Sequence, residues 1–291
     1  MLIVGDLLPE RARAQAEKHG VPAFGTAEDV LAHPDVELIV NLTLPASHVA
    51  VSSAALAAGK HVWSEKPIGI DRESASALLA HADAAGLRLM SIENVPPRFY
   101  DKIMLGQEGR EQQLDNMIAT VDNLGKAGVP ILGYNFMPGG VWRTANDTAV
   151  RGGALATSFD YEQARRVRPG ERTNFGIWTT VQIDREYSEE EIWDNYCWYL
   201  ERLLPACEQA GVRLALPPDD PPVPTLGGVG RVFRNFDNFR RAMETFDSPM
   251  HGLNFCHGCW SEMRAGEGVL EAIRFFGERG KIFYVHLRDV Q

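Results

Sequence analysis

The chain has 291 residues, of which 45% are hydrophobic and 23% are charged, as in soluble globular proteins with room for one large domain or two ordinary ones. Its formal net charge of -10 argues against a nucleic-acid partner, because phosphate backbones are bound by basic surfaces. Without an apolar run of ~18 residues, a signal peptide or a cysteine framework, the sequence predicts a cytoplasmic protein with reduced thiols and no membrane partner.

The first part of the chain alternates short strands with helices. Helices are predicted at Pro9–His19, Thr26–Leu31, Ser47–Ala58 and Arg72–Ala85. Gly20 follows the first of them as a C-cap. Strands are predicted at Leu2–Val4, Glu37–Leu42 and His61–Ser64, the second of them as a buried strand. Because strands that alternate with helices at this spacing form βαβ units, we expect parallel pairing and an α/β fold.

From Leu87 the α/β pattern continues with longer units. Strands are predicted at Leu87–Ile92, Pro130–Phe136, Gly176–Ile183, Arg213–Leu216, Leu253–Cys256 and Ile282–His286. Helices are predicted at Arg110–Ala127, Glu189–Ala210 and Gly266–Arg279. The segment Gly139–Arg172 is long, polar and rich in glycine. Long loops of this kind usually lie over the site of a barrel.

Two features of the first segment are typical of a dinucleotide-binding fold. Asp6 ends the first strand, where an acid commonly binds a ribose hydroxyl. Residues 57–67 read Ala-Ala-Gly-Lys-His-Val-Trp-Ser-Glu-Lys-Pro. Over residues 1–88 the sequence resembles the Gfo/Idh/MocA oxidoreductases. The resemblance implies a Rossmann-like domain in which Asp6 binds ribose and Lys66 lies near the nicotinamide.

The glycine turn of such a fold is missing from the sequence ahead of Asp6. That turn, G-x-G-x-x-G, brings the backbone and a helix N-terminus to the pyrophosphate. We therefore expect a partial Rossmann-like segment that does not bind NAD(P). An NAD(P)-dependent sugar oxidoreductase stays the alternative function of this segment.

Short motifs after residue 89 recur at the ends of predicted strands. They are Ile92-Glu93-Asn94-Val95-Pro96, Tyr134-Asn135-Phe136-Met137-Pro138, Trp142-Arg143-Thr144, Pro218-Asp219-Asp220-Pro221, Asn254-Phe255-Cys256-His257-Gly258 and Val285-His286-Leu287-Arg288. In this order, residues 89–291 resemble mannonate dehydratase. The resemblance implies an incomplete (β/α)8 TIM-type barrel, preceded by the Rossmann-like fragment of residues 1–88.

The motif residues carry the chemistry that such a site needs. Cys256 and His286 each close a predicted strand, and a thiolate with an imidazole suits Mn²⁺, Fe²⁺ or Zn²⁺. Arg288 is predicted to bind a substrate carboxylate, and Asn135 and Arg143 to orient sugar hydroxyls. The resemblance implies a lyase that converts the sugar acid D-mannonate to 2-keto-3-deoxy-D-gluconate with Mn²⁺ or Fe²⁺.

Two departures predict impaired activity. The family pattern His-Pro-Asp-Asp-Pro, whose histidine is a metal ligand, reads Pro-Pro-Asp-Asp-Pro here, with Pro217 at the ligand position. The family's later Arg-Pro-Asp-His-Gly motif, with a fourth ligand, does not occur before Gln291. Of four ligands, Cys256 and His286 remain, whereas metal sites usually supply three or four.

Other interpretations of the second segment stay open. One is a non-catalytic sugar-acid binding protein on an incomplete barrel, whose unpaired strand edges would favour a homo-oligomer. A zinc site with Cys256-x-x-Cys259 is a weak prediction without a second pair. Glu93 is either catalytic or a strand-end acid that holds a neighbouring loop.

Overall fold

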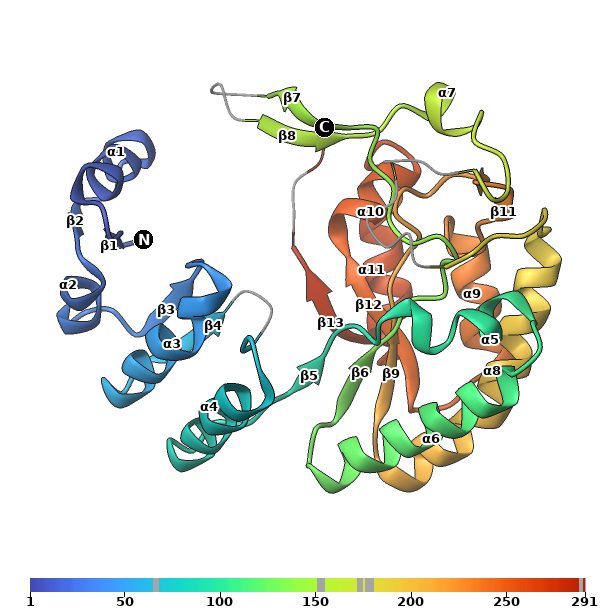
Figure 1. The fold of residues 1–291 in the computed structure, drawn as a ribbon, viewed down its shortest axis with the longest axis horizontal. Helices are drawn as coiled ribbons and strands as arrows, with labels where there is room; N and C mark the ends of the chain where they lie inside the picture. Colours follow the sequence, from blue (N-terminus) through green and yellow to red (C-terminus); the bar gives the residue numbers. More distant parts are fainter. Residues whose placement is uncertain (65–67, 151–154, 172–174, 176–180, 288–289, 291) are drawn as a thin grey trace. The chain divides into compact units, whose positions relative to one another are not determined.

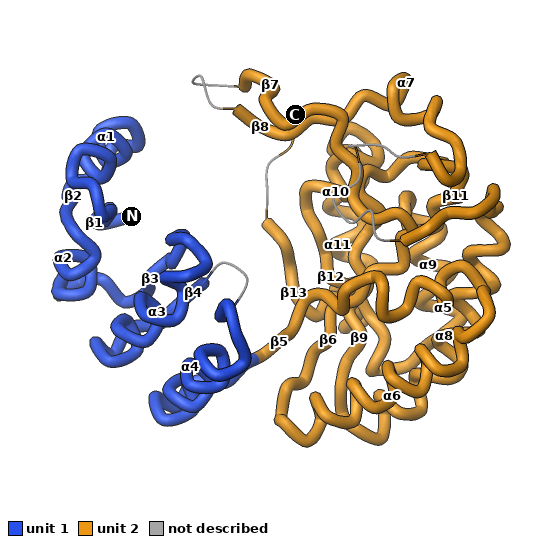
Figure 2. Tube along the Cα trace, viewed as in Figure 1, with its two compact units in different colours: residues 1–89 blue, residues 90–291 orange. Residues whose placement is uncertain are grey.

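The computed structural model describes residues 1–64, 68–150, 155–171, 175, 181–287 and 290. The chain divides into two compact units, Met1–Leu89 and Met90–Gln291 (Figure 2). Both are mixed α/β, as predicted from the alternation of strands and helices. Among the described residues, no helix has both the length and the apolar character needed to cross a bilayer.

Unit 1 contains two separate two-stranded parallel sheets. β1 (Ile3–Gly5) pairs with β2 (Ala23–Gly25), and β3 (Leu38–Asn41) pairs with β4 (His61–Ser64). The helices are α1 (Pro9–His19), α2 (Ala27–Ala32), the 3-10 helix η1 (Pro45–Ser47), α3 (His48–Ala57) and α4 (Arg72–Ala84). The predicted parallel pairing is confirmed. β2 is a strand that the sequence analysis did not predict.

The prediction of a buried strand at β3 is wrong for half of its side chains. Ile39 and Asn41 are buried, whereas Leu38 and Val40 are 52% and 53% exposed. Asn41 Nδ2 donates hydrogen bonds to the carbonyl of His48 and to Ser52 Oγ of α3 (3.1 and 3.0 Å). One face of the strand therefore packs on α3, and the alternation of side chains leaves the other face in solvent.

Unit 2 is built on a five-stranded parallel sheet in the order β13-β12-β9-β6-β5 (Figure 1). The strands are β5 (Ser91–Ile92), β6 (Ile131–Gly133), β9 (Arg213–Leu216), β12 (His251–Cys256) and β13 (Ile282–His286). The helices are η2 (Pro97–Phe99), α5 (Asp101–Leu105), α6 (Arg110–Lys126), α7 (Tyr161–Ala164), α8 (Glu189–Ala210), α9 (Phe236–Thr245), α10 (His257–Met263) and α11 (Val269–Glu278).

Helix α8 supplies much of the core of unit 2. It starts in a capping box of Ser188 and Glu191 and ends at Gly211, which has φ +69°. Its buried face carries aromatic side chains, among them Tyr196, whose ring lies 4.7 Å from that of Phe233. This helix and α6 pack against each other beside the sheet (Figure 1).

The segments between the strands depart most from the sequence predictions. The predicted loop Gly139–Arg172 includes an antiparallel hairpin of β7 (Ala145–Ala149) and β8 (Leu155–Ser158), followed by α7. A second small hairpin joins β10 (Thr225–Leu226) and β11 (Val229–Gly230). The strand predicted at Gly176–Ile183 lies partly outside the described residues, and residues 181–183 form no strand.

The sheet of unit 2 curls. β5 and β13 are its two edge strands, yet His286 at the end of β13 contacts Glu93, which directly follows β5 (Nε2 to Oε2, 2.7 Å). Tyr284 of β13 likewise lies against Gly133 of β6, although β12 and β9 separate these strands in the sheet. The carboxyl ends of the first and last strands are thus brought within side-chain reach, as in part of a barrel.

Candidate active site

Polar side chains gather where the strands of unit 2 end. Glu93 follows β5, Asn135 follows β6, Cys256 ends β12 and His286 ends β13. Because the strands are parallel, their carboxyl ends share one edge, where barrel enzymes assemble their sites. Cys256 and His286 are direct Cα partners across the β12–β13 pair. The structure therefore brings together the two predicted metal ligands.

His286 hydrogen-bonds with two other side chains at this edge. Its imidazole hydrogen-bonds with Cys256, and Nε2 donates to Glu93 Oε2 at 2.7 Å. These hydrogen bonds, first that with Cys256 and then that with Glu93, raise the pKa of His286 to about 9 against the opposing effect of burial. A thiol, an imidazole and a carboxylate thus form one connected chain.

Glu93 is held by side chains from across the sheet. Its Oε1 accepts a hydrogen bond from Nδ2 of the fully buried Asn254 on β12 (3.2 Å). Burial and the nearby Glu93 carboxylate raise the pKa of the Tyr284 hydroxyl. At Gly133 there is no room for a side chain, because a Cβ atom would overlap the Tyr284 hydroxyl and lie 3.0 Å from Cγ of Glu93. The carboxylate is therefore fixed between three strands.

Asn135 presents a buried amide at the same edge. Its backbone N–H donates to Tyr100 Oη at 3.1 Å, which fixes the start of the loop after β6. The side chain is 3% exposed, and among the described residues its Nδ2 meets no hydrogen-bond acceptor. A buried donor without a partner is costly, so a substrate oxygen would satisfy it. This agrees with the predicted role of Asn135, which stays a prediction.

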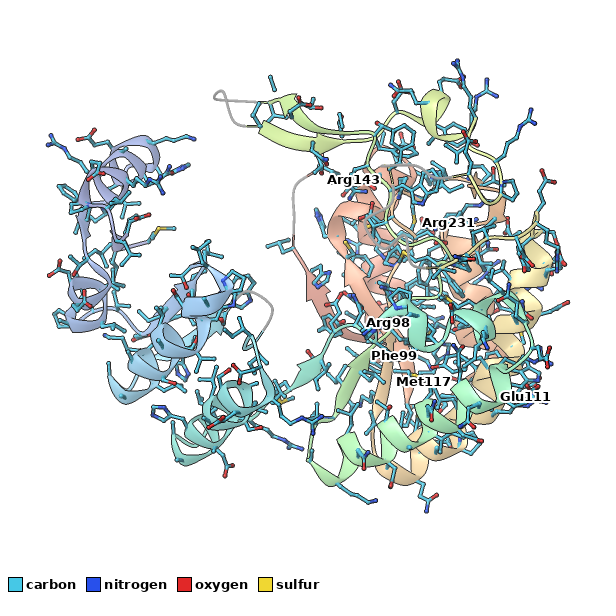
Figure 3. The ribbon with its side chains drawn as sticks, viewed as in Figure 1. Arg98, Phe99, Glu111, Met117, Arg143 and Arg231 are labelled. Carbon is cyan, nitrogen blue, oxygen red and sulfur yellow. The ribbon has the colours of Figure 1, made fainter. Side chains whose placement is uncertain are left out.

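Arg143 is bound to an aspartate in the loop after β9. Its Nη1 and Nη2 donate to Asp220 Oδ1 and Oδ2 at 2.6 and 2.8 Å, in a bidentate ion pair. Nε also donates to Thr157 Oγ1 at 3.3 Å. Figure 3 shows Arg143 and Arg231 in the segments beyond the strand ends. In this arrangement Arg143 orients the loops, and its predicted contact with sugar hydroxyls would require it to share its donors.

The donors at the strand ends suit a divalent transition metal in type. The Cys256 sulfur and the His286 imidazole are the ligands that Mn²⁺, Fe²⁺ and Zn²⁺ take in proteins, whereas the buried side chain of Pro217 has no donor atom. Among the described residues, one set of three acidic or thiol side chains brings its ligand atoms within 4.8 Å of one another: Asp220, Cys259 and Glu262. Cys259 thus groups with carboxylates rather than with Cys256, unlike the predicted Cys-x-x-Cys pair.

Sequence reasoning missed that second set and the partner of Glu93. The helix α10 starts directly after Cys256, so Cys259 and Glu262 lie three residues apart on one helix face. That spacing was visible in the sequence, but the approach of Asp220 was not. The pairing of Glu93 with His286, 193 positions later, depends on the curl of the sheet.

The remaining predicted site residues are Asp6, Lys66 and Arg288. Lys66 and Arg288 lie outside the described residues. Asp6 follows β1 in unit 1, where its Oδ1 accepts a hydrogen bond from the backbone N–H of Leu8 at 2.9 Å. Its predicted contact with a ribose stays a prediction.

The sequence matches the family model described as D-mannonate dehydratase (UxuA) over residues 59–291. The chain belongs to the mannonate dehydratase family. It is 32% identical over 229 residues to a mannonate dehydratase of Thermotoga petrophila, covering 72% of this chain and 62% of that protein. Mannonate dehydratase 2 of Halalkalibacterium halodurans is 30% identical over 233 residues, covering 76% and 66%. The chain therefore spans less than two thirds of the length of these relatives.

One solved structure has a similar fold. The solved structure of mannonate dehydratase from Streptococcus suis serotype 2 matches with a TM-score of 0.64 at 24% identity, over 85% of this chain and 69% of that chain. A second family model, an oxidoreductase family with an NAD-binding Rossmann fold, matches residues 3–93. Both resemblances drawn from the sequence motifs are thus confirmed.

Proposed function

We propose that this chain is a metal-dependent hydro-lyase that dehydrates a sugar acid, D-mannonate, to 2-keto-3-deoxy-D-gluconate. Family membership supports the reaction class. The observation that carries the proposal for this chain is the pairing of Cys256 with His286 at the carboxyl edge of the parallel sheet. We interpret that sheet as five strands of a (β/α)8 barrel, in which this edge is the catalytic face.

Dehydration removes a weakly acidic proton beside a carboxylate and expels a hydroxyl group. A bound Mn²⁺ or Fe²⁺ would act as a Lewis acid on substrate oxygens. Cys256 and His286 would hold the ion. The Asn135 amide donates a hydrogen bond to a substrate oxygen and so orients the sugar chain. Arg288 binds the substrate carboxylate in this proposal, as the family resemblance implies.

Pro217 lowers the metal affinity that we expect of the site. Where the family pattern has a histidine ligand, this chain offers a side chain without a donor. Fewer ligands hold a labile ion less tightly. We therefore propose that the chain binds its metal weakly and turns over slowly, with sugar-acid binding as the more robust property.

The test combines metal binding with product formation. Mn²⁺ is titrated into the metal-free chain, and keto-deoxygluconate is measured after incubation with D-mannonate. Cys256→Ser and His286→Asn should each abolish metal binding and product. Cys259→Ser is the matched control, because Cys259 is a buried cysteine only three residues from Cys256, and should bind Mn²⁺ like the unmodified chain.

Three results would contradict the proposal. Loss of Mn²⁺ in Cys259→Ser, with Cys256→Ser unaffected, would place the ion at Asp220, Cys259 and Glu262. Tight mannonate binding without metal and without product would identify a sugar-acid binding protein. Product formed equally by the unmodified chain and by His286→Asn would show that the proposed ligands are wrong.

A further inference from the structure

Glu93 joins the two edges of the sheet in unit 2. It follows β5 at one edge, while its carboxylate contacts His286 on β13 at the other edge and Asn254 on the neighbouring β12. Both of its oxygens are therefore used, Oε2 at 2.7 Å from the imidazole and Oε1 at 3.2 Å from the amide. Both of these partners, among the residues that the structure describes, lie on strands of the sheet.

The surroundings of Glu93 restrict its movement. Gly133 leaves room for the Glu93 and Tyr284 side chains that a Cβ atom would displace. The Glu93 side chain is only 20% exposed, whereas that of His286 is 44% exposed. The restricted Glu93 carboxylate thus accepts a hydrogen bond from the more exposed His286 ring, and this contact can fix the orientation of the ring.

When one nitrogen of a neutral imidazole donates a hydrogen bond, the other nitrogen carries the lone pair and can bind a metal ion. When Nε2–H is hydrogen-bonded to a carboxylate, the neutral ring has its lone pair on Nδ1. The carboxylate also makes the ring more electron-rich and a better ligand. Removal of such a partner typically lowers metal affinity by 10- to 100-fold.

We propose that Glu93 is a positioning residue that commits Nε2 of His286 to its carboxylate and leaves Nδ1 as the metal-ligating nitrogen beside Cys256. This inference rests on the proposed function, because it assumes that His286 is a metal ligand. Glu93 itself neither touches the substrate nor binds the ion. Its effect reaches the site through the orientation and proton distribution of the imidazole.

The test uses Co²⁺, whose thiolate charge-transfer absorption reports binding at Cys256. Glu93→Gln keeps the size of the side chain and removes its charge, and Glu93→Asp keeps the charge on a shorter stem. Asp247→Asn is the matched control, since it removes a carboxylate that pairs with Lys281 (2.9 Å) just ahead of β13, at the opposite end of that strand. We expect Glu93→Gln to weaken Co²⁺ binding about 10- to 100-fold, with a weaker loss in Glu93→Asp and none in Asp247→Asn.

A second readout does not depend on metal. The ¹⁵N shifts of the His286 ring in the metal-free chain, recorded at a pH above the pKa of the ring so that the ring is neutral, show which nitrogen carries the proton, and Glu93→Gln should shift protonation away from Nε2. Thermal melting identifies any variant that fails to fold, in which case Glu93→Asp carries the comparison. Unchanged Co²⁺ affinity and unchanged ring shifts in a folded Glu93→Gln chain would overturn the proposal, whatever its melting temperature. If the unmodified chain binds no Co²⁺, the proposed function fails, and the ring shifts alone decide the role of Glu93.

Discussion

Removal of the guanidinium of Arg231 should destabilise unit 2 more than any change at an exposed ion pair. Arg231 and Asp219 have side chains 0% and 1% exposed, with Nε 2.9 Å from Oδ1. Arg231 also donates to the carbonyls of Pro138 and Gly140 (3.3 and 3.1 Å), and Asp219 accepts from the N–H of Phe233 (2.7 Å). The pair therefore ties the loop after β6 to the loop after β9, on the side of the sheet that carries the candidate site.

Arg231→Met leaves the Asp219 charge buried without a partner, which costs about 3–5 kcal/mol. The two carbonyls lose their donor, which adds to this loss. Arg231→Lys keeps the charge but not the planar fork, so it should be intermediate. The double variant Arg231→Met with Asp219→Leu loses the donor of the two carbonyls as well, but it replaces the buried unpaired charge with an unsatisfied Phe233 N–H, at about 1–3 kcal/mol. It should therefore be more stable than Arg231→Met alone.

Urea unfolding followed by tryptophan fluorescence measures these differences, because all tryptophans except Trp63 lie in unit 2. Arg241→Gln is the control, since it breaks a pair with Glu190 whose side chains are 43% and 68% exposed, and should cost less than about 1 kcal/mol. The reasoning is refuted if Arg231→Met loses no more stability than this control. It is also refuted if the double variant is less stable than Arg231→Met.

Two further predictions concern buried groups of the sheet. Burial lowers the pKa of His251 to about 4, with a contribution from Lys281. As the pH falls, the His251 imidazole is therefore protonated in the unfolded chain before it is protonated in the folded chain. The free energy of unfolding is unaffected by this group above pH ~6.5 and decreases by up to about 3 kcal/mol as the pH drops towards 4. His251→Gln should flatten this part of the pH–stability curve, and an unchanged slope would contradict the role of His251. Gly133→Ala should destabilise unit 2 by about 1–3 kcal/mol through overlap with Tyr284 and Glu93, and normal melting of this variant would show that the strands there are not tightly packed.

Elements with strong local signals were predicted well from the sequence. The predicted bounds of α1, α8, β9 and β13 agree with the structure, because caps, turn glycines and apolar runs are local features. The prediction failed where neighbours decide the outcome. β5 has two residues instead of the six predicted, since pairing with β6 extends only over Ser91 and Ile92. The exposed face of β3 could not be anticipated, because a continuous apolar run does not reveal which of its faces is covered.

Some features of the candidate site could also be predicted from the sequence, and others could not. Cys256 and His286 could be predicted because each ends a strand, and parallel strands end at one edge. The partners of Arg143 and Glu93 could not, because each contact joins segments that are distant in sequence. The Arg143 guanidinium forms a bidentate ion pair with Asp220, a contact that the sequence did not indicate, and its predicted contact with sugar hydroxyls stays a prediction.

The two family models overlap in one segment of the chain, and the structure of that segment explains why both match it. Residues 59–93 are matched by both families, and this stretch contains α4, its terminal glycine and β5. Gly86, with φ +71°, ends the helix, and the chain then leads into a parallel strand. A helix, a left-handed glycine and a strand form the repeating unit of both Rossmann folds and barrels. The local sequence therefore satisfies either fold, and what assigns β5 to unit 2 is its pairing with β6 together with the contacts of Glu93 across the sheet.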